Sequence, residues 1–182
     1  MTNDIKSILV TEEQIDEITT KLANQLTNDY KDSKKQLVLV CILKGSIMFT
    51  CELMKKIPLP LEVEVMKVSS YGASSVSSGI ININLDIKRN DLSDADFVII
   101  EDIIDSGRTL SHLIKYFKER GANSVKTCTL LDKPDRRTID LTPDYYGIRI
   151  PDEFVVGFGL DYDEKYRNLP YIGILDPKVY TK

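Results

Sequence analysis

The 182-residue sequence lacks tryptophan, has one histidine and three cysteines, and has no excess of basic residues. A single histidine argues against a Ser-His-Asp hydrolase and against metal sites built from several histidines. With 24 Lys and Arg against 28 Asp and Glu, the net charge of −4 argues against a general nucleic-acid binder. Cys41, Cys51 and Cys128 are odd in number and each lies in an apolar stretch, which predicts buried thiols rather than a disulfide or a zinc site.

Long apolar runs are also missing. No run approaches the roughly 20 residues of a membrane span, and the N-terminal MTNDIKSILV lacks the basic-then-apolar layout of a secretory signal. The composition, 42% hydrophobic and 29% charged, is that of an ordinary globular protein. We therefore expect one domain over residues 1–182, in the cytoplasm, without a membrane partner.

Helical and strand patterns alternate along the chain, which predicts an α/β fold. The first helix, over 11–30, begins with Thr11 and Gln14 in capping-box spacing, and further helices are expected over about 46–56 and 109–120. The continuously apolar 37–43 is typical of a strand buried on both faces of a parallel sheet. The other expected strands are 61–68, 81–85, 97–100, 125–131, 154–158 and 171–175.

Residues 69–79 (SSYGASSVSSG) contain six serines and two glycines. Such a segment offers too little apolar surface to hold one conformation, which predicts a mobile loop. The strand expected at 81–85 alternates apolar and polar residues, so it is half exposed and pairs back on 61–68.

The segment 101–109 (EDIIDSGRT) lies between a buried strand and a helix, where an open α/β sheet binds its ligands. Small residues, hydroxyls and backbone N–H groups at a helix N-terminus can hold a phosphate monoester. The adjacent carboxylates can accept hydrogen bonds from a vicinal diol or bind Mg²⁺ through water. Together they indicate a ribose 5-phosphate. The alternative is a helix cap beside surface acids, and no Walker loop occurs in the chain.

This segment resembles the phosphoribosyl-diphosphate motif of type I phosphoribosyltransferases. The resemblance extends to the hypoxanthine-guanine phosphoribosyltransferases and covers nearly the whole chain: it includes 43–45 (LKG), 70–72 (SYG), 133–134 (KP) and 152–167 (DEFVVGFGLDYDEKYR). It implies a mostly parallel twisted sheet flanked by helices, and a small hood made from the N-terminal segment, residues 150–182 and a flexible loop. Departures are few: Ser106 replaces a threonine of many relatives, and Gly159 replaces an alanine of some.

The resemblance assigns the sugar side of a site. Glu101 and Asp102 would hold the ribose hydroxyls and, with Asp161, Mg²⁺. Asp105 would exchange a proton with N7 of a purine, a task that suits a carboxylate. It could instead, or in addition, cap the helix. The 5′-phosphate would bind Ser106, Gly107, Arg108 and Thr109.

The resemblance also assigns the other substrates. Lys44, Gly45 and Arg167 would bind diphosphate. Alternatively, Lys44 and Gly45 form only a turn between a strand and a helix, and Arg167 is a solvated loop residue. Lys133 would donate to the 6-oxo group of the purine, or is an exposed loop lysine. Ser70 and Tyr71 would close over the sugar. Phe154 would stack on the purine, Val155 would supply backbone groups to its edge, and Leu160 would line its far side. Residues 154–158 (FVVGF) could equally form a strand of the core, with alternate side chains buried.

The activity so implied is transfer of the 5-phosphoribosyl group from phosphoribosyl diphosphate to N9 of hypoxanthine or guanine, giving IMP or GMP with Mg²⁺ as cofactor, in a homodimer or homotetramer. Xanthine or adenine are alternative acceptors, and Lys133 argues against adenine, whose amino group would leave the ammonium unpaired. An alternative of another class is a phosphoribosyl-diphosphate sensor that regulates transcription. Such a regulator needs a basic face or a DNA-binding segment.

Overall fold

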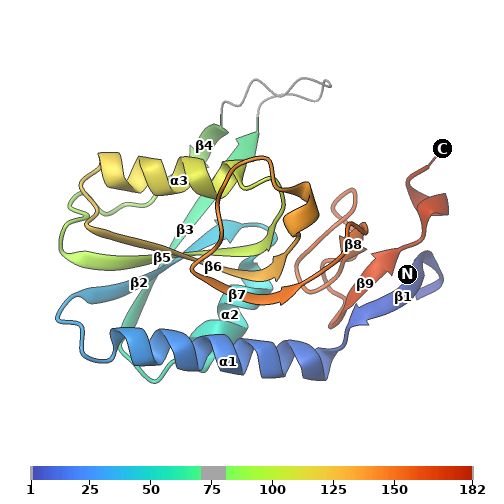
Figure 1. Cartoon of the computed structure of the whole chain (residues 1–182), viewed down its shortest axis with the longest axis horizontal. Coiled ribbons are helices and arrows are strands. Elements are labelled where there is room, and N and C mark those ends of the chain that lie inside the picture. The colour runs from blue at the N-terminus through green and yellow to red at the C-terminus, as the bar shows by residue number, and fades with distance from the viewer. Residues whose placement is uncertain (1, 71–80, 182) are drawn as a thin grey trace.

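The computed structural model of the chain describes residues 2–70 and 81–181. These residues form two sheets and three α-helices, together with short 3₁₀ turns (Figure 1). The helices are α1 (Glu12–Tyr30), α2 (Ile47–Lys55) and α3 (Arg108–Glu119). The strands are β1 (Ile5–Val10), β2 (Gln36–Leu43), β3 (Leu61–Ser70), β4 (Ile81–Leu85), β5 (Ala95–Ile104), β6 (Ser124–Asp132), β7 (Tyr145–Arg149), β8 (Val155–Val156) and β9 (Ile172–Leu175).

The main sheet has six strands in the order β4-β3-β2-β5-β6-β7. All neighbouring pairs are parallel except β3 and β4, which run antiparallel as predicted. After Gln36, the strand β2 is continuously apolar because its residues pack alternately on two cores: Leu39 with α1 and α2, and Val40 with α3. The predicted mixed α/β class, a mostly parallel sheet between helical layers, is confirmed.

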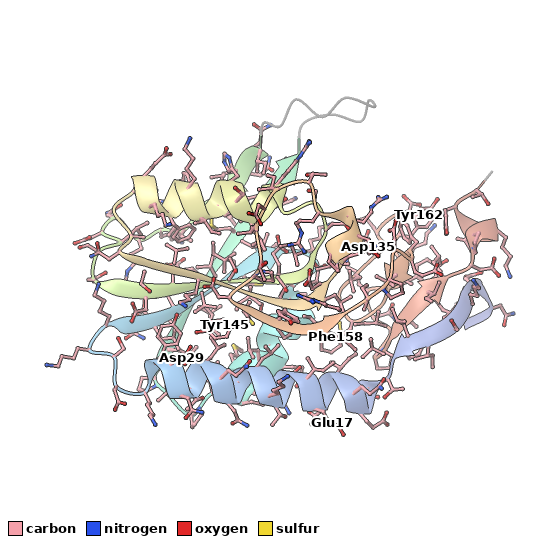
Figure 2. All side chains as sticks on the ribbon, viewed as in Figure 1. Glu17, Asp29, Asp135, Tyr145, Phe158 and Tyr162 are labelled. Atoms are coloured by element: carbon pink, nitrogen blue, oxygen red, sulfur yellow. The ribbon has the colours of Figure 1, made fainter. Side chains whose placement is uncertain are left out.

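The helix α1 begins where the sequence predicts. Thr11 is its N-cap, Gln14 N donates to Thr11 Oγ1 at 3.2 Å, and Thr11 N donates to Gln14 Oε1 at 2.9 Å. These bonds satisfy two backbone donors that a helix start leaves unpaired. At the other end, Tyr145 of β7 donates its hydroxyl to Asp29 at 2.5 Å, which ties α1 to the edge of the main sheet (Figure 2).

A second sheet, in the order β1-β9-β8, is built from both ends of the chain and lies at one end of the molecule (Figure 1). We use the name hood for β1 together with residues 150–181. Its strands pair antiparallel, with Ile8 opposite Gly173 and Val156 opposite Gly173 on the other side. The expected hood of N- and C-terminal segments is therefore present.

Several boundaries differ from prediction. The strand β5 continues to Ile104, so the acidic pair 101–102 lies in the strand and not in a loop. The strands β1 and β7 were not predicted; β1 is mostly exposed and lacks a clear apolar alternation. Only two of the residues expected at 154–158 form a strand, β8. Residues 69 and 70 of the expected loop 69–79 belong to β3 instead, and the rest of that segment lies outside the described residues.

All three cysteines are free thiols. Cys41 and Cys128 are buried as predicted, but the predicted burial of Cys51 is wrong, because it lies on the exposed face of α2. Among the described residues, no helix is both long and apolar enough to cross a membrane.

Candidate active site

The carboxyl ends of β2 and β5 bring two predicted segments together. These strands are adjacent and parallel, with Cys41 opposite Ile100, so Lys44 and Gly45 lie beside the acidic end of β5. A Cβ atom on Gly45 would lie 1.7 Å from Asp102 Oδ2. Only glycine fits so close an approach, and the Leu43–Lys44 peptide bond that precedes it is cis.

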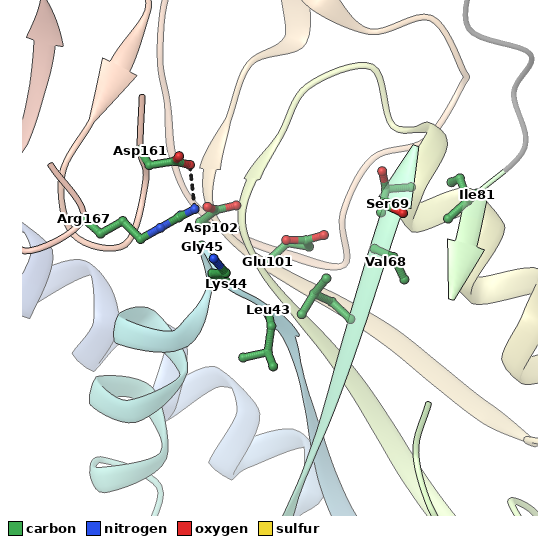
Figure 3. A pocket seen from close by; sticks show the side chains of 12 residues that line it. Leu43, Lys44, Gly45, Val68, Ser69, Ile81, Glu101, Asp102, Asp161 and Arg167 are labelled. Atoms are coloured by element: carbon green, nitrogen blue, oxygen red, sulfur yellow. Dashed lines mark ion pairs between the residues drawn. The ribbon is translucent and has the colours of Figure 1, made fainter. Parts of the chain in front are cut away.

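A pocket of about 450 Å³ opens at this edge of the sheet (Figure 3). It collects predicted residues from three parts of the chain, and its lining also includes Val68, Ser69 and Ile81. The predicted members are Lys44, Gly45, Glu101, Asp102, Thr109, Asp161 and Arg167. The sugar, diphosphate and metal residues inferred from the sequence therefore share one cavity.

Burial raises the pKa of the Glu101 carboxyl well above its ordinary value of 4.5, and the nearby charge of Asp102 raises it further. Burial also raises the pKa of Asp102 to about 6, against a smaller lowering by the hydrogen bond that Ile103 N donates at 2.8 Å and by the charge of Arg167. Two carboxyls with raised pKa values, side by side in a pocket, are typical of a functional site.

The predicted phosphate segment forms the turn between β5 and α3. Gly107 is the N-cap of α3, with a φ of 84° that favours glycine, and Arg108 N donates to Ser106 Oγ at 3.3 Å. Arg137 holds this turn in place through hydrogen bonds. Its Nε donates to the Asp105 carbonyl at 2.9 Å, and its guanidinium also bonds the buried Asp132 carboxylate.

Asp105 lies in a second pocket of about 360 Å³. It does not cap α3, since Gly107 does, so the alternative role of Asp105 as a helix cap is wrong. Its Oδ1 is buried and has no hydrogen-bond partner, and Arg136 Nε lies 3.9 Å away. A buried carboxylate oxygen without a partner costs free energy, which is typical of an atom that meets a ligand.

The same second pocket contains the predicted purine residues Lys133, Phe154, Val155 and Leu160. Lys133 is only 7% exposed, so it is not the surface lysine of the alternative interpretation, and its Nζ donates to the Glu153 carbonyl at 2.9 Å. Val155 and Leu160 are buried and also belong to the core, whereas Phe154 is 40% exposed. The Phe154 ring stacks on Tyr180, with centroids 5.0 Å apart.

Arg167 joins the hood to the first pocket. Its guanidinium donates to the Gly159 carbonyl at 2.7 Å and pairs with Asp161 Oδ1 at 2.9 Å (Figure 3). Glu164 Oε2 lies 3.4 Å from Arg167 Nη2 and 2.8 Å from Lys44 Nζ. The two cations predicted to bind diphosphate therefore face one carboxylate.

Tyr71 and the side chain of Ser70 lie outside the described part of the structure, although the backbone of Ser70 ends β3. Other residues at the pockets were not singled out from the sequence, because each reaches the site only through the tertiary fold. Isolated charges and a terminal tyrosine carry no local signal of this placement. The residues concerned are Ser69, Arg136 and Tyr180, which line the pockets, and Arg137 and Glu164, which contact predicted site residues.

The donor set fits Mg²⁺ bound jointly with a substrate. Within residues 2–70 and 81–181, no group of three or more His, Cys, Asp or Glu side chains converges to hold a metal by itself. Mg²⁺, however, keeps several waters and binds through one or two carboxylates and the phosphates of a substrate. Glu101 and Asp102 supply such carboxylates, and their raised pKa values indicate that a cation would be favourable beside them.

Comparisons with known proteins agree with this geometry. Residues 7–163 match the family model of the phosphoribosyl transferase domain. Among curated proteins, the chain is 51% identical to a hypoxanthine-guanine phosphoribosyltransferase of Streptococcus thermophilus, with 98% of both chains covered. It is 48% identical to the Bacillus subtilis protein of the same name, over 99% of this chain and 98% of the relative.

A solved structure is equally similar. The hypoxanthine phosphoribosyltransferase of Staphylococcus aureus superposes with a TM-score of 0.94 at 48% identity, covering 100% of this chain and 97% of the other. A parallel sheet with an acidic strand end and a phosphate turn defines the class, that of the phosphoribosyltransferases. Within that class, the chain belongs to the hypoxanthine-guanine phosphoribosyltransferase family.

Proposed function

We propose that this protein transfers the 5-phosphoribosyl group of phosphoribosyl diphosphate to N9 of hypoxanthine or guanine, forming IMP or GMP and diphosphate. One observation carries the proposal: residues 101–109 join the two pockets, with Glu101 and Asp102 in one and Asp105 in the other. With the roles proposed here, the diol-binding pair and the proton acceptor would lie on either side of the point where sugar and base meet, which supports the transfer. The names of the curated relatives support the same activity.

The chain's own groups account for the bond changes. The purine N9 attacks the anomeric carbon, the bond from that carbon to diphosphate breaks, and the N7 proton passes to the Asp105 carboxylate. Asp105 Oδ1 has no hydrogen-bond partner of its own, so it can accept that proton. Ser106, Gly107, Arg108 and Thr109 would hold the 5′-phosphate at the start of α3. Ser70 and Tyr71 would cover the sugar and exclude water.

The base is selected by the second pocket. Lys133 is held at its edge by the Glu153 carbonyl, from where the ammonium can donate to a 6-oxo group. Phe154 would stack on the purine, while Val155 and Leu160 would border it. Adenine is disfavoured, because its 6-amino group would leave a nearly buried ammonium unpaired. Xanthine is the alternative acceptor.

The first pocket would hold the leaving group. Lys44, Gly45 and Arg167 would bind the diphosphate. Glu101, Asp102 and Asp161 would hold Mg²⁺, which when bound neutralises charge on the diphosphate. A pair of cations next to three carboxylates gives a mixed-sign site, which suits a metal-bound diphosphate better than a free polyanion.

A second copy of the chain is the proposed partner, in a homodimer or homotetramer. Val63, Val65 and Leu85 are 40–44% exposed. They share the sheet face that α2 covers at its centre, since Val63 pairs with the buried Leu39. An apolar edge of this kind is typical of an interface. Sedimentation velocity of wild type and Val65→Glu tests it: the variant should sediment as a smaller species.

We place the enzyme in the cytoplasm. Its three cysteines are all free, and Cys51 is an exposed thiol. Free thiols are typical of reducing compartments.

One assay tests the function. The protein is incubated with phosphoribosyl diphosphate, Mg²⁺ and each of hypoxanthine, guanine, xanthine and adenine, and nucleotide formation is followed by absorbance. We expect turnover with hypoxanthine and guanine, and none with adenine. Binding of the sugar diphosphate without turnover of any oxopurine would support the regulatory alternative, against which the net charge of −4 already argues.

A further inference from the structure

Glu164 contacts two cations that line the diphosphate pocket, and the proposed reaction leaves it without a role. Its Oε2 accepts a hydrogen bond from Lys44 Nζ at 2.8 Å, across 120 positions of sequence. The same oxygen lies 3.4 Å from Arg167 Nη2. One carboxylate oxygen is therefore shared by the two cations assigned to diphosphate, the arrangement that a phosphate oxygen would take up between them.

The backbone at Glu164 is unusual for its residue type. Tyr162 and Lys165 exchange two backbone hydrogen bonds, at 3.2 and 3.0 Å, so residues 162–165 form a tight hairpin turn. Asp163 and Glu164 both have positive φ, 51° and 62°. Turns of this kind favour Gly, Asn and Asp, and glutamate is a poor choice there.

The turn places the Glu164 side chain next to Lys44 and Arg167. Asp161 Oδ2 accepts from Glu164 N at 2.9 Å, which fixes the backbone from which the side chain extends. Asp163, its neighbour in the same turn, instead pairs with Lys165 at 3.4 Å. The position of Glu164 thus serves the contact with Lys44 and Arg167, and not the formation of the turn.

Stability does not explain the contact either. The side chains of Glu164 and Lys44 are 65% and 52% exposed. Ion pairs between such exposed groups contribute little to folding and are easily exchanged for other ions. A more highly charged anion can therefore displace the Glu164 carboxylate from these cations.

We propose that Glu164 is an exchangeable anion beside the diphosphate pocket: its carboxylate pairs with Lys44 and, together with Asp161, with Arg167, and diphosphate displaces it on binding. This inference rests on the diphosphate role proposed above for those two cations. The exchange weakens diphosphate binding, because the ligand must first break two ion pairs. It also assists product release, because Glu164 can pair again with the cations as diphosphate leaves.

The test compares Glu164→Gln with Asp163→Asn, a matched control that removes the same charge from the adjacent turn residue. Isothermal titration calorimetry with inorganic diphosphate and Mg²⁺ measures Kd, and steady-state assays measure product inhibition by diphosphate. We expect Glu164→Gln to bind diphosphate about three- to ten-fold more tightly, with a matching fall in the inhibition constant. Asp163→Asn should stay within about two-fold of wild type.

The outcomes separate this inference from the proposed function. If wild type catalyses the transfer but Glu164→Gln binds diphosphate as weakly as wild type or more weakly, the exchange is wrong and the function stands. If wild type binds neither diphosphate nor phosphoribosyl diphosphate, both are wrong. A crystal structure with diphosphate bound gives a second readout, since Glu164 should then lie beyond hydrogen-bond distance of Lys44.

Discussion

The main sheet and the hood contribute to the site in different ways. The sheet supplies its sugar and phosphate residues from one continuous segment, 101–109, at the end of β5. Apart from Val155 of β8, the hood supplies its residues from loops, in which four non-glycine residues have positive φ: Phe158, Asp163, Glu164 and Tyr166. Side chains rarely adopt this conformation without support from the surrounding fold.

One of the close contacts between the two regions joins two glycines. A Cβ atom on Gly159 of the hood would lie 2.0 Å from the Gly45 carbonyl oxygen of the sheet side. With the proposed roles, proton transfer depends on Asp105 at the end of the main sheet, whereas binding of the base and the diphosphate also depends on the position of the hood. Variants of each region should consequently fail in different ways.

The largest effect is expected for Asp105→Asn on the sheet side. Loss of the proton acceptor should lower kcat by about 10³-fold, as is typical for a general base. Binding of IMP, measured by calorimetry, should remain within a few-fold of wild type, because the phosphate turn and the hood are unchanged. An unchanged rate would remove the role assigned to Asp105.

Gly159→Ala tests the contact between the regions. The added methyl group must push the hood loop away from Gly45, and Arg167, which donates to the Gly159 carbonyl at 2.7 Å, moves with it. A misplacement of about 1 Å costs about 10²-fold in rate, so kcat/KM should fall by about that factor.

Gly121→Ala is the matched control for this contact. Gly121 has a φ of 90°, similar to the 101° of Gly159, but no heavy atom lies within 4 Å of its Cβ position. It should lose about 1 kcal/mol of stability from backbone strain and keep its kcat/KM. Equal losses of activity in both variants would show that strain, and not the clash with Gly45, is responsible.

The contrast between the regions also explains what the sequence could predict. The residues of 101–109 are contiguous between a buried strand and an amphipathic helix, so their shared position is visible in the sequence. Thr11 and Gln14 likewise form a local pattern, which the structure reproduces. Glu164, by contrast, reads as one solvated charge in an acidic loop, because its partner Lys44 lies 120 positions away.

The same reasoning applies to the strands of the hood. The strand β1, which was not predicted, has one buried residue, and β8 has only two of the residues expected at 154–158, so neither carries a long apolar period. Both form because they pair with β9, a contact between the two ends of the chain. The hood is therefore the part of the fold that depends most on tertiary structure and least on local sequence.

Asp102→Asn, on the sheet side, should stabilise the fold and at the same time reduce the transfer activity. The folded-state pKa of Asp102 is raised to about 6 from 3.8, so the folded protein retains a proton that the unfolded chain has released. The free energy of unfolding of wild type therefore falls as pH rises from about 4 through 6. The variant lacks this penalty and should be about 1–2 kcal/mol more stable at pH 7.5.

Thermal unfolding without Mg²⁺ or nucleotide measures this effect. The gain should appear as a Tm a few degrees higher at pH 7.5 and should shrink toward pH 4, while transfer activity is strongly reduced. Asp163→Asn, an exposed carboxylate in the hood turn, should change Tm little at either pH. A variant less stable than wild type at pH 7.5 would contradict the raised pKa.

The smallest effect is expected at Thr11, where the chain passes from β1 of the hood into α1 beneath the main sheet. Thr11→Ala removes the acceptor of the Gln14 N–H and should lower the free energy of unfolding by about 1 kcal/mol. Because Thr11 contacts neither pocket, kcat should not change, so urea unfolding and the assay together show whether the two regions are coupled through this junction. Thr11→Ser keeps the hydroxyl and should retain most of the stability. If it loses as much as Thr11→Ala, the threonine methyl group and not the cap stabilises the junction.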